Sequence, residues 1–204
     1  MPFLELCCGE GGADARSAWE PVASSVFAEV FRFEWEGRLY YHKRYLERGW
    51  LEAVKARTIG SRAERAWRGG LLLEENAFGT PEVVVAGWRG AECFAVTRAV
   101  VGGMGLEQYL RRMKARTGSG ARRAAWRVEE ELGRVVGRMH KCGIIHGDLR
   151  WGNVLVEGEP ENPQFVFLDN ERTKRYRRVP RRKILKNLVQ LNLIPNLAMS
   201  RTER

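Results

Sequence analysis

The sequence predicts an α+β fold with two lobes, a small antiparallel sheet followed by a minimal, mainly helical lobe. One observation is a strand-like alternation over residues 26–45, broken by turn-forming Glu36-Gly37, which is the pattern of a β-hairpin. Another is a single apolar stripe over residues 122–140, typical of a core helix. We place the N-terminal lobe at 1–97 and the C-terminal lobe at 98–204, with a hinge around 97–103.

Composition restricts the class of protein. The chain has 204 residues, 44% of them hydrophobic and 29% charged, as in a soluble globular protein. It has no run of 18 apolar residues, and its first residues do not resemble a secretory signal, so we expect a cytoplasmic protein. The four cysteines lack metal-ligand spacing, and we interpret them as reduced thiols without a zinc site.

The N-terminal half begins with residues 1–24, which have no clear period and are expected to form a loosely ordered lead-in. Lys43 lies in the second strand of the predicted hairpin. Ser61 followed by Glu64 is a capping box, and it predicts a helix that runs to about residue 75. Two more strands are expected on either side of the Arg89-Gly90 turn, over residues 83–88 and 93–97.

The C-terminal half is predicted to be mainly helical. A short amphipathic helix begins near Leu106, and the basic, Gly/Ser-interrupted segment 111–123 is expected to be a solvated loop. The core helix over 122–140 stops at Gly143. Two short apolar runs and one last helix follow, over residues 154–156, 165–168 and 184–191.

One loop carries the chemistry. Residues 146–153 (HGDLRWGN) lie between the core helix and the apolar run at 154–156, and the next apolar run ends at Asp169. An aspartate, an asparagine five residues later and an aspartate after the next strand form a phosphoryl-transfer set. Asp148 would orient or accept a proton from the attacking hydroxyl. Asn153 and Asp169 would hold magnesium against nucleotide phosphates, although each alone could be a turn former or a strand-end cap.

These residues resemble the protein-kinase-like superfamily and, more narrowly, the lipopolysaccharide kinases of the Kdo/WaaP family. The resemblance spans about residues 24–204 and rests on four segments, 41–45 (YHKRY), 146–153 (HGDLRWGN), 168–173 (LDNERT) and 187–192 (NLVQLN). The second is shared with sugar and antibiotic kinases, and the last two are more distinctive. The resemblance implies ATP and Mg²⁺ as cofactors.

The same resemblance assigns roles in the N-terminal half. Lys43 would neutralise nucleotide phosphates, and Glu64 is the candidate for its ion-pair partner, with Glu74 and Glu75 as competitors. Backbone groups from Arg98 to Val100 would meet the adenine.

Three departures from protein kinases bear on the substrate. No Gly-rich loop precedes the first predicted strand, and Asp169 is followed by Asn170-Glu171 rather than Phe-Gly. Only the 35 residues 170–204 follow Asp169, without a peptide-docking Ala-Pro-Glu element. A protein substrate is therefore not expected.

The net charge of +10 is concentrated, with nine Lys/Arg and no acid between residues 172 and 186. Such a run is often only a solvated face, but it also suits a polyanion. We therefore expect a kinase acting on a Kdo or heptose hydroxyl of the lipopolysaccharide core, an anionic glycolipid, peripherally at the acidic cytoplasmic face of the inner membrane. Nucleic acid and an obligate protein partner are not expected. The alternatives are a soluble sugar or antibiotic phosphotransferase and a non-catalytic kinase-like binding protein.

Overall fold

The structure is a computed structural model, and it describes residues 3–8, 18–46, 49–89, 92–115 and 119–192. The chain forms two compact units. The first comprises residues 1–70 and 81–100, and the second comprises residues 71–80 and 101–204. One unit is built on an antiparallel sheet and the other mainly on helices, which confirms the predicted α+β class.

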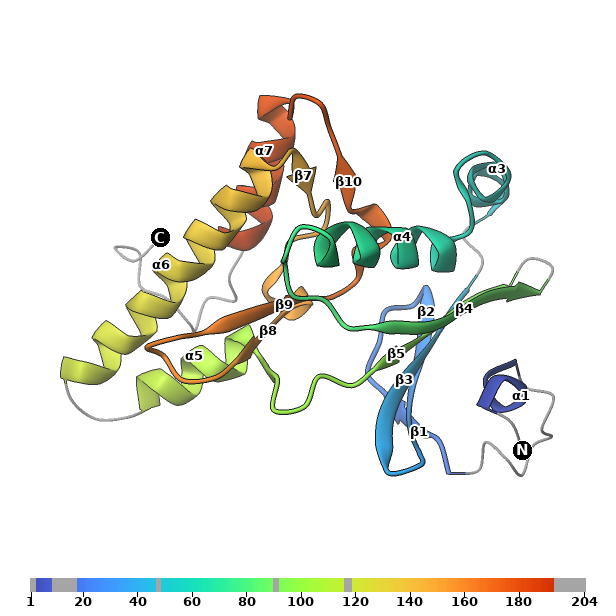
Figure 1. Cartoon of the computed structure of the whole chain (residues 1–204), viewed down its shortest axis with the longest axis horizontal. Helices are drawn as coiled ribbons and strands as arrows, with labels where there is room; N and C mark the ends of the chain where they lie inside the picture. Colours follow the sequence, from blue (N-terminus) through green and yellow to red (C-terminus); the bar gives the residue numbers. More distant parts are fainter. Residues whose placement is uncertain (1–2, 9–17, 47–48, 90–91, 116–118, 193–204) are drawn as a thin grey trace. The chain divides into compact units, whose positions relative to one another are not determined.

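The first unit contains a five-stranded antiparallel sheet in the order β1-β2-β3-β5-β4 (Figure 1). Its strands are β1 Glu20–Val22, β2 Ala28–Trp35, β3 Arg38–Tyr45, β4 Val83–Arg89 and β5 Glu92–Arg98. The predicted hairpin is confirmed as β2–β3. Its turn residues Glu36 and Gly37 have φ of 50° and 70°, and two positive φ angles are what a tight two-residue hairpin loop requires.

An aromatic cluster covers part of this sheet. Phe33, Tyr40 and Val96 are buried there together with Leu6 and Cys7 from helix α1 (Phe3–Cys8). The sequence predicted a loosely ordered lead-in over residues 1–24, whereas the described parts of that segment include α1 and β1. The helix is stabilised by apolar burial against the sheet, which the local sequence pattern does not reveal.

Two helices follow β3. Helix α4 (Arg62–Glu74) was predicted, and its capping box forms, because the Ser61 hydroxyl accepts the Glu64 N–H at 3.1 Å. Helix α3 (Trp50–Ile59) was not predicted. It lies between Gly49 and Gly60, and its residues 54–59 are all exposed, so no apolar stripe marks it in the sequence.

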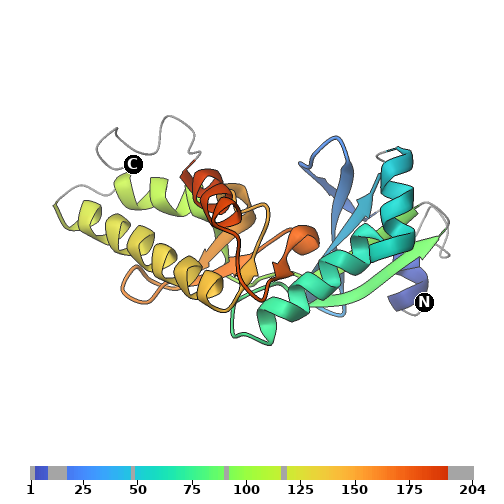
Figure 2. The same ribbon diagram turned by 90° about the horizontal axis from the view of Figure 1, so that it is seen from above.

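The second unit is built on three helices, α5 (Leu106–Ala115), α6 (Ser119–Lys141) and α7 (Arg181–Asn192) (Figure 2). Short strands form two small antiparallel sheets, β6-β8-β9 and β10-β7. The strands are β6 Met104–Gly105, β7 Ile144–Ile145, β8 Val154–Glu157, β9 Gln164–Phe167 and β10 Lys174–Arg175. The 3₁₀ turns η1 Trp151–Asn153 and η2 Asn170–Arg172 complete the unit.

The core of this unit confirms the predicted stripe. Along α6, residues Ala125, Val128, Leu132, Val135, Val136 and Met139 are all buried. The predicted solvated loop at 111–123 is wrong, because α5 continues to Ala115 and α6 already begins at Ser119. Met113, buried beside Leu110, extends the apolar stripe of α5; residues 116–118 lie outside the described part.

Cys7 and Cys93 are buried free thiols, Cys142 is an exposed one, and the side chain of Cys8 lies outside the description. Gly143 ends α6 with φ of 77°, as expected of a helix C-cap. Within the described ranges, no helix is both long and apolar enough to cross a bilayer.

Candidate functional site

The loop before Asp148 is held in place by its buried neighbours. Gly147 has φ of +79°, and a Cβ there would lie 2.6 Å from the backbone oxygen of Arg172, so only glycine fits. The Thr173 hydroxyl donates to the His146 carbonyl at 3.3 Å. These contacts tie the loop to the segment after β9, which brings Asp148 and Asp169 into one neighbourhood.

His146 contributes to structure rather than chemistry. Its side chain is fully buried, and its Nε2 lies 3.0 Å from the Leu168 carbonyl. Burial lowers the pKa of His146, although the Leu168 carbonyl and the charges of Asp169 and Asp148 act in the opposite direction. The neutral ring therefore donates from Nε2 to Leu168 and fixes the residue that precedes Asp169.

Asn153 connects the two halves of the predicted catalytic set. Its Nδ2 donates to the Asp148 carbonyl at 2.9 Å, and its own carbonyl accepts the Leu168 N–H at 2.9 Å. Asp169 follows Leu168 directly and adopts the left-handed conformation, with φ 60° and ψ 55°. That conformation is uncommon outside glycine, is best tolerated by Asn and Asp, and clusters at functional sites. The structure thus assembles all three predicted residues.

The oxygens of this set fit Mg²⁺. Because the amide nitrogen of Asn153 is used by the Asp148 carbonyl, its Oδ1 is the atom left to act as a ligand. Asp169 supplies a carboxylate, and hard cations such as Mg²⁺ take oxygen ligands, typically one or two from protein with the rest from water and phosphate. Among the described residues there is no cluster of three or more His, Cys, Asp or Glu, so an all-protein metal cage is not what these residues form.

The side chain of Asp148 is oriented by two donors. Its Oδ1 accepts a hydrogen bond from Arg150 Nε at 2.8 Å and another from Gln190 Nε2 at 3.2 Å. Arg150 is mostly exposed, whereas the Asp148 side chain is only 14% exposed. Gln190 comes from helix α7, and the sequence pattern does not predict this role for it.

Gln190 is itself held by a small polar network. Its Oε1 accepts from Asn187 Nδ2 at 3.3 Å and from the Leu149 N–H at 3.4 Å. Asn187 is fully buried, and its Oδ1 lies 3.4 Å from His140 Nε2 on α6. Both α7 residues belong to the 187–192 segment of the sequence resemblance, which was the available signal for them.

Lys43 lies at the middle of the sheet in the first unit. It stands on β3 between Val30 of β2 and Ala95 of β5, and its side chain is partly buried. Its Nζ lies 5.1 Å from the centre of the Tyr45 ring, a cation–π contact. A central strand holds the backbone of this lysine rigidly.

Two of the other three predicted residues of the first unit, Glu64 and Arg98, form local ion pairs. Glu64 Oε1 pairs with Arg68 Nη2 at 2.6 Å, and its role as the partner of Lys43 stays a prediction. Arg98 ends β5 and pairs with Glu82 at 2.6 Å. The backbone N–H groups of residues 98 and 99 are both used by the sheet, and Val100 is the first residue beyond them.

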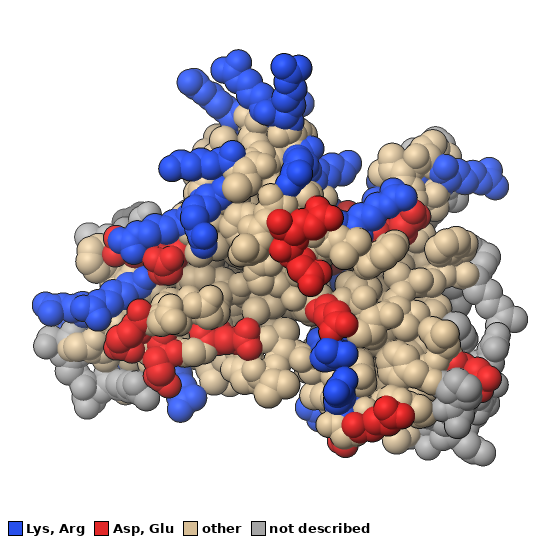
Figure 3. Space-filling view, in the orientation of Figure 1, with Lys and Arg blue, Asp and Glu red and all other residues tan. Residues whose placement is uncertain are grey.

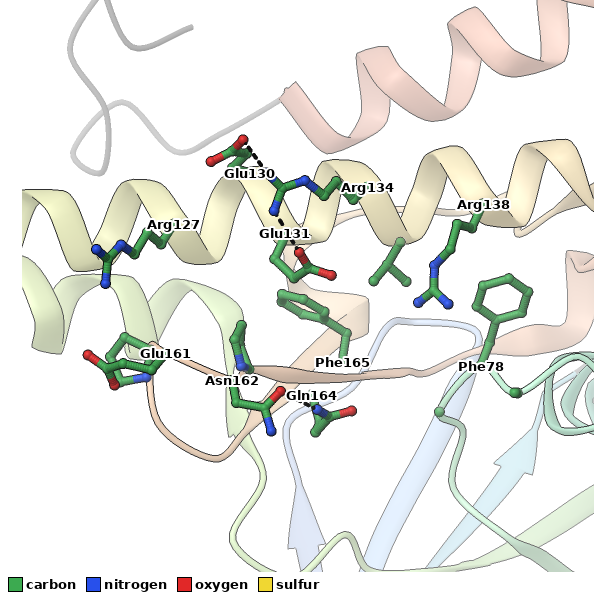
Figure 4. Close-up of a pocket in the computed structure, with 15 residues that line it drawn as sticks. Phe78, Arg127, Glu130, Glu131, Arg134, Arg138, Glu161, Asn162, Gln164 and Phe165 are labelled. Carbon is green, nitrogen blue, oxygen red and sulfur yellow. Dashed lines mark hydrogen bonds and ion pairs between the residues drawn. The ribbon is translucent and has the colours of Figure 1, made fainter.

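A separate cavity of about 570 Å³ lies in the second unit, lined by α6, residues 77–79 and residues 160–165 (Figure 4). Two of its three lining arginines have partners. Arg134 is paired with Glu130 and Glu131, and the guanidinium of Arg138 lies 5.8 Å from the Phe78 ring centre. None of the predicted catalytic residues lines it, so we do not assign it the reaction.

A solved structure described as WaaP in complex with acyl carrier protein is similar, with a TM-score of 0.68 and 22% identity, over 99% of this chain and 82% of that one. This likeness confirms the predicted protein-kinase-like fold. No curated protein matches the sequence. The family model described as "Lipopolysaccharide kinase (Kdo/WaaP) family" matches residues 20–203. The chain belongs to the lipopolysaccharide kinase (Kdo/WaaP) family.

Proposed function

We propose that the protein transfers a phosphoryl group from ATP, with Mg²⁺, to a Kdo or heptose hydroxyl of the lipopolysaccharide inner core. The observation that carries this proposal is Asn153, whose amide binds the Asp148 carbonyl and whose carbonyl binds the residue before Asp169. Asn153, itself a candidate oxygen ligand, thereby joins the candidate base Asp148 to the second ligand Asp169, which completes the set that phosphoryl transfer to an alcohol requires.

Each residue of this set would act at a defined atom. Asp148 would accept the proton of the attacking hydroxyl, and the Gln190 donor would keep its carboxylate in position. Asn153 Oδ1 and the Asp169 carboxylate would hold Mg²⁺, which neutralises charge on the phosphates when bound. Arg150, now paired with Asp148, is exposed enough to exchange that partner for a phosphate or an anionic acceptor.

The nucleotide would be held by the first unit. Lys43 on β3 is the candidate to neutralise the phosphates, with Glu64 as a candidate to position it. For the adenine, the sheet already uses the N–H groups of Arg98 and Ala99. The backbone of Val100 is therefore the better candidate to face the base.

The acceptor class follows from family membership and charge. An anionic glycolipid suits the nine Lys/Arg between residues 172 and 186, and it would be met at the cytoplasmic face of the inner membrane. The WaaP structure was solved in complex with acyl carrier protein. Acyl carrier protein is therefore also a partner to test, against our expectation that no protein partner is needed.

Transfer of radiolabel from ATP to purified core lipopolysaccharide tests the proposal directly. Asp148→Asn keeps the shape of the side chain and removes its basic oxygen, so we expect labelling to fall by at least about a hundredfold. Glu159→Gln is the matched control, because it makes the same charge change at an exposed residue of the β8–β9 loop. Equal activity of the two variants would contradict the assignment of Asp148.

The acceptor panel should also contain free sugars and aminoglycosides. Labelling of a soluble acceptor but not of lipopolysaccharide would make the protein a small-molecule kinase. Binding of ATP without turnover on any acceptor would support the non-catalytic alternative.

A further inference from the structure

Helix α7 has two faces with different surroundings. The inward face carries the fully buried Asn187 and the half-buried Gln190, which reach the Asp148 loop. The outward face carries Leu185, Leu188 and Val189, whose exposed fractions are 63%, 41% and 48%. Spacings of three and four place these aliphatic side chains on one side of the helix. An exposed apolar face of this kind usually marks an interaction site.

Cations surround this aliphatic face. Arg181, Arg182 and Lys186 lie on α7 itself, and the exposed Arg177 and Arg178 immediately precede it. In Figure 3 the Lys and Arg side chains gather over this part of the second unit without acidic side chains among them. Within the described parts of the chain, none of these five cations makes an ion pair. The surface therefore carries a strong, uncompensated positive potential.

The charges in the first turn of α7 do not stabilise the helix. This turn holds three cations, Arg181, Arg182 and Lys183, and no acid. The positive end of the helix dipole lies at this terminus, so cations there oppose helix formation. A sequence that keeps three of them at an unfavourable position is better explained by an anion outside the molecule than by the stability of the fold.

We propose that the outward face of α7 docks the protein on an anionic lipid bilayer. Leu185, Leu188 and Val189 would enter the interfacial layer while the surrounding cations meet lipid phosphates, as in interfacial amphipathic helices. Aliphatic side chains on a convex helix surface suit a deformable lipid layer better than a shaped protein pocket. This assignment deepens the proposed function by naming the surface that meets the membrane.

Docking through α7 would also place the acceptor near the chemistry. Gln190 contacts Asp148 from the inward face, so the docked face lies about one helix diameter, roughly 10 Å, from that contact. A sugar close to the lipid anchor is within such a distance of a bilayer surface. The same helix would thus position the base and present it to a membrane-bound substrate.

Sedimentation of the full chain with vesicles tests the proposal, without ATP so that the result is independent of kinase activity. We expect binding to vesicles of phosphatidylcholine with one quarter phosphatidylglycerol, weakening with added NaCl, and little binding to phosphatidylcholine alone. Arg181→Gln/Arg182→Gln should weaken binding about 25-fold, from roughly fivefold per cation. The control Arg122→Gln/Arg123→Gln makes the same charge change on α6 and should leave most of the binding.

Two further variants separate docking from folding. Arg181→Lys/Arg182→Lys keeps the charge and should bind like the parent. Leu185→Gln/Leu188→Gln should weaken binding on the order of tenfold by removing the apolar contribution, whereas Val101→Gln, at an 88% exposed site, should not. Thermal unfolding of the Arg181→Gln/Arg182→Gln variant should be unchanged or shifted to higher temperature, because unfavourable helix-end charges are removed.

Several results would overturn the proposal. Equal binding to neutral vesicles would show that the cations around α7 do not select an anionic bilayer. An equal loss of binding in the α6 control would show that α7 is not the specific contact. If vesicles do not bind but poly-L-glutamate does, and the α7 variants abolish that binding, the surface belongs to an acidic protein partner instead.

Vesicle binding that persists in a chain without kinase activity would leave the docking intact and reject only the proposed reaction.

Discussion

Gln190 Nε2 donates a hydrogen bond of 3.2 Å to Asp148 Oδ1, so the candidate base is positioned by a side chain 42 residues further along the chain. The donor is held in turn by Asn187, a fully buried residue of the same helix. The orientation of Asp148 therefore depends on how α7 packs against the rest of its unit, although α7 carries none of the predicted catalytic residues.

Removing this donor should affect catalysis more than ATP binding. A hydrogen bond to a charged group contributes about 1.5–3 kcal/mol, so Gln190→Ala should lower kcat about tenfold to a hundredfold, with KM for ATP nearly unchanged. Asn192→Ala is the control, since the Asn192 side chain is exposed and, among the described residues, bonds only to the Leu188 carbonyl of its own helix. Steady-state kinetics distinguishes the two. A lower melting temperature with unchanged kcat would show that Gln190 is structural only.

Two glycines of the catalytic loop should respond differently to alanine. At Gly147 a Cβ would lie 2.6 Å from the Arg172 carbonyl and φ is +79°, so Gly147→Ala should cost at least about 1–3 kcal/mol. At Gly152 a Cβ meets nothing within 4 Å, and Gly152→Ala should be nearly neutral. Urea unfolding of both variants measures the difference. Similar midpoints would mean that the loop can rearrange around the extra methyl group.

Stability should fall on the acidic side of neutrality because of His146. Burial lowers its folded-state pKa below the ordinary 6.5, so the unfolded chain binds more protons in the window just below 6.5. The free energy of unfolding that the neutral His146 ring contributes is therefore fully present above pH 6.5, and it decreases as pH falls toward the folded-state pKa. His140, whose pKa is also lowered by burial, adds to the same trend.

Urea midpoints between pH 8 and pH 5 measure this dependence. His146→Asn removes the titrating group, so its midpoint should be lower at pH 8 but should change less with pH than that of the parent. If the urea midpoint changed equally with pH in both proteins, the pH dependence of stability would come from other residues.

Asn153 should be tested through the magnesium requirement. Asn153→Ala removes both the candidate ligand oxygen and the bond to the Asp148 carbonyl, so the Mg²⁺ concentration for half-maximal activity should rise about tenfold or more, by analogy with the loss of a metal-supporting side chain. Asn162→Ala, at an exposed turn residue, is the control. A fall in activity with an unchanged Mg²⁺ requirement would assign Asn153 to loop structure alone.

The parts of the fold that could be predicted depend on neighbours in sequence. The hairpin turn needs two residues with positive φ, and Glu36-Gly37 provides them within the chain itself. The stripe along α6 repeats at helical spacing because one face meets the core. Helix α3 has no such stripe, and α1 is stabilised by distant sheet residues such as Tyr40, so neither was predicted.

For the candidate site, the same division holds. The sequence by itself determined which residue types carry the chemistry, since the spacing of Asp148, Asn153 and Asp169 along one loop and two strands is a local property. Only the tertiary structure decided which distant residues hold them in place, because Gln190, one of the two donors to Asp148, and Leu168, whose carbonyl meets His146, come from segments far along the chain. It also decided that the apolar residues of α7 face outward, since burial depends on which side of a helix meets the core and not on the order of its residues.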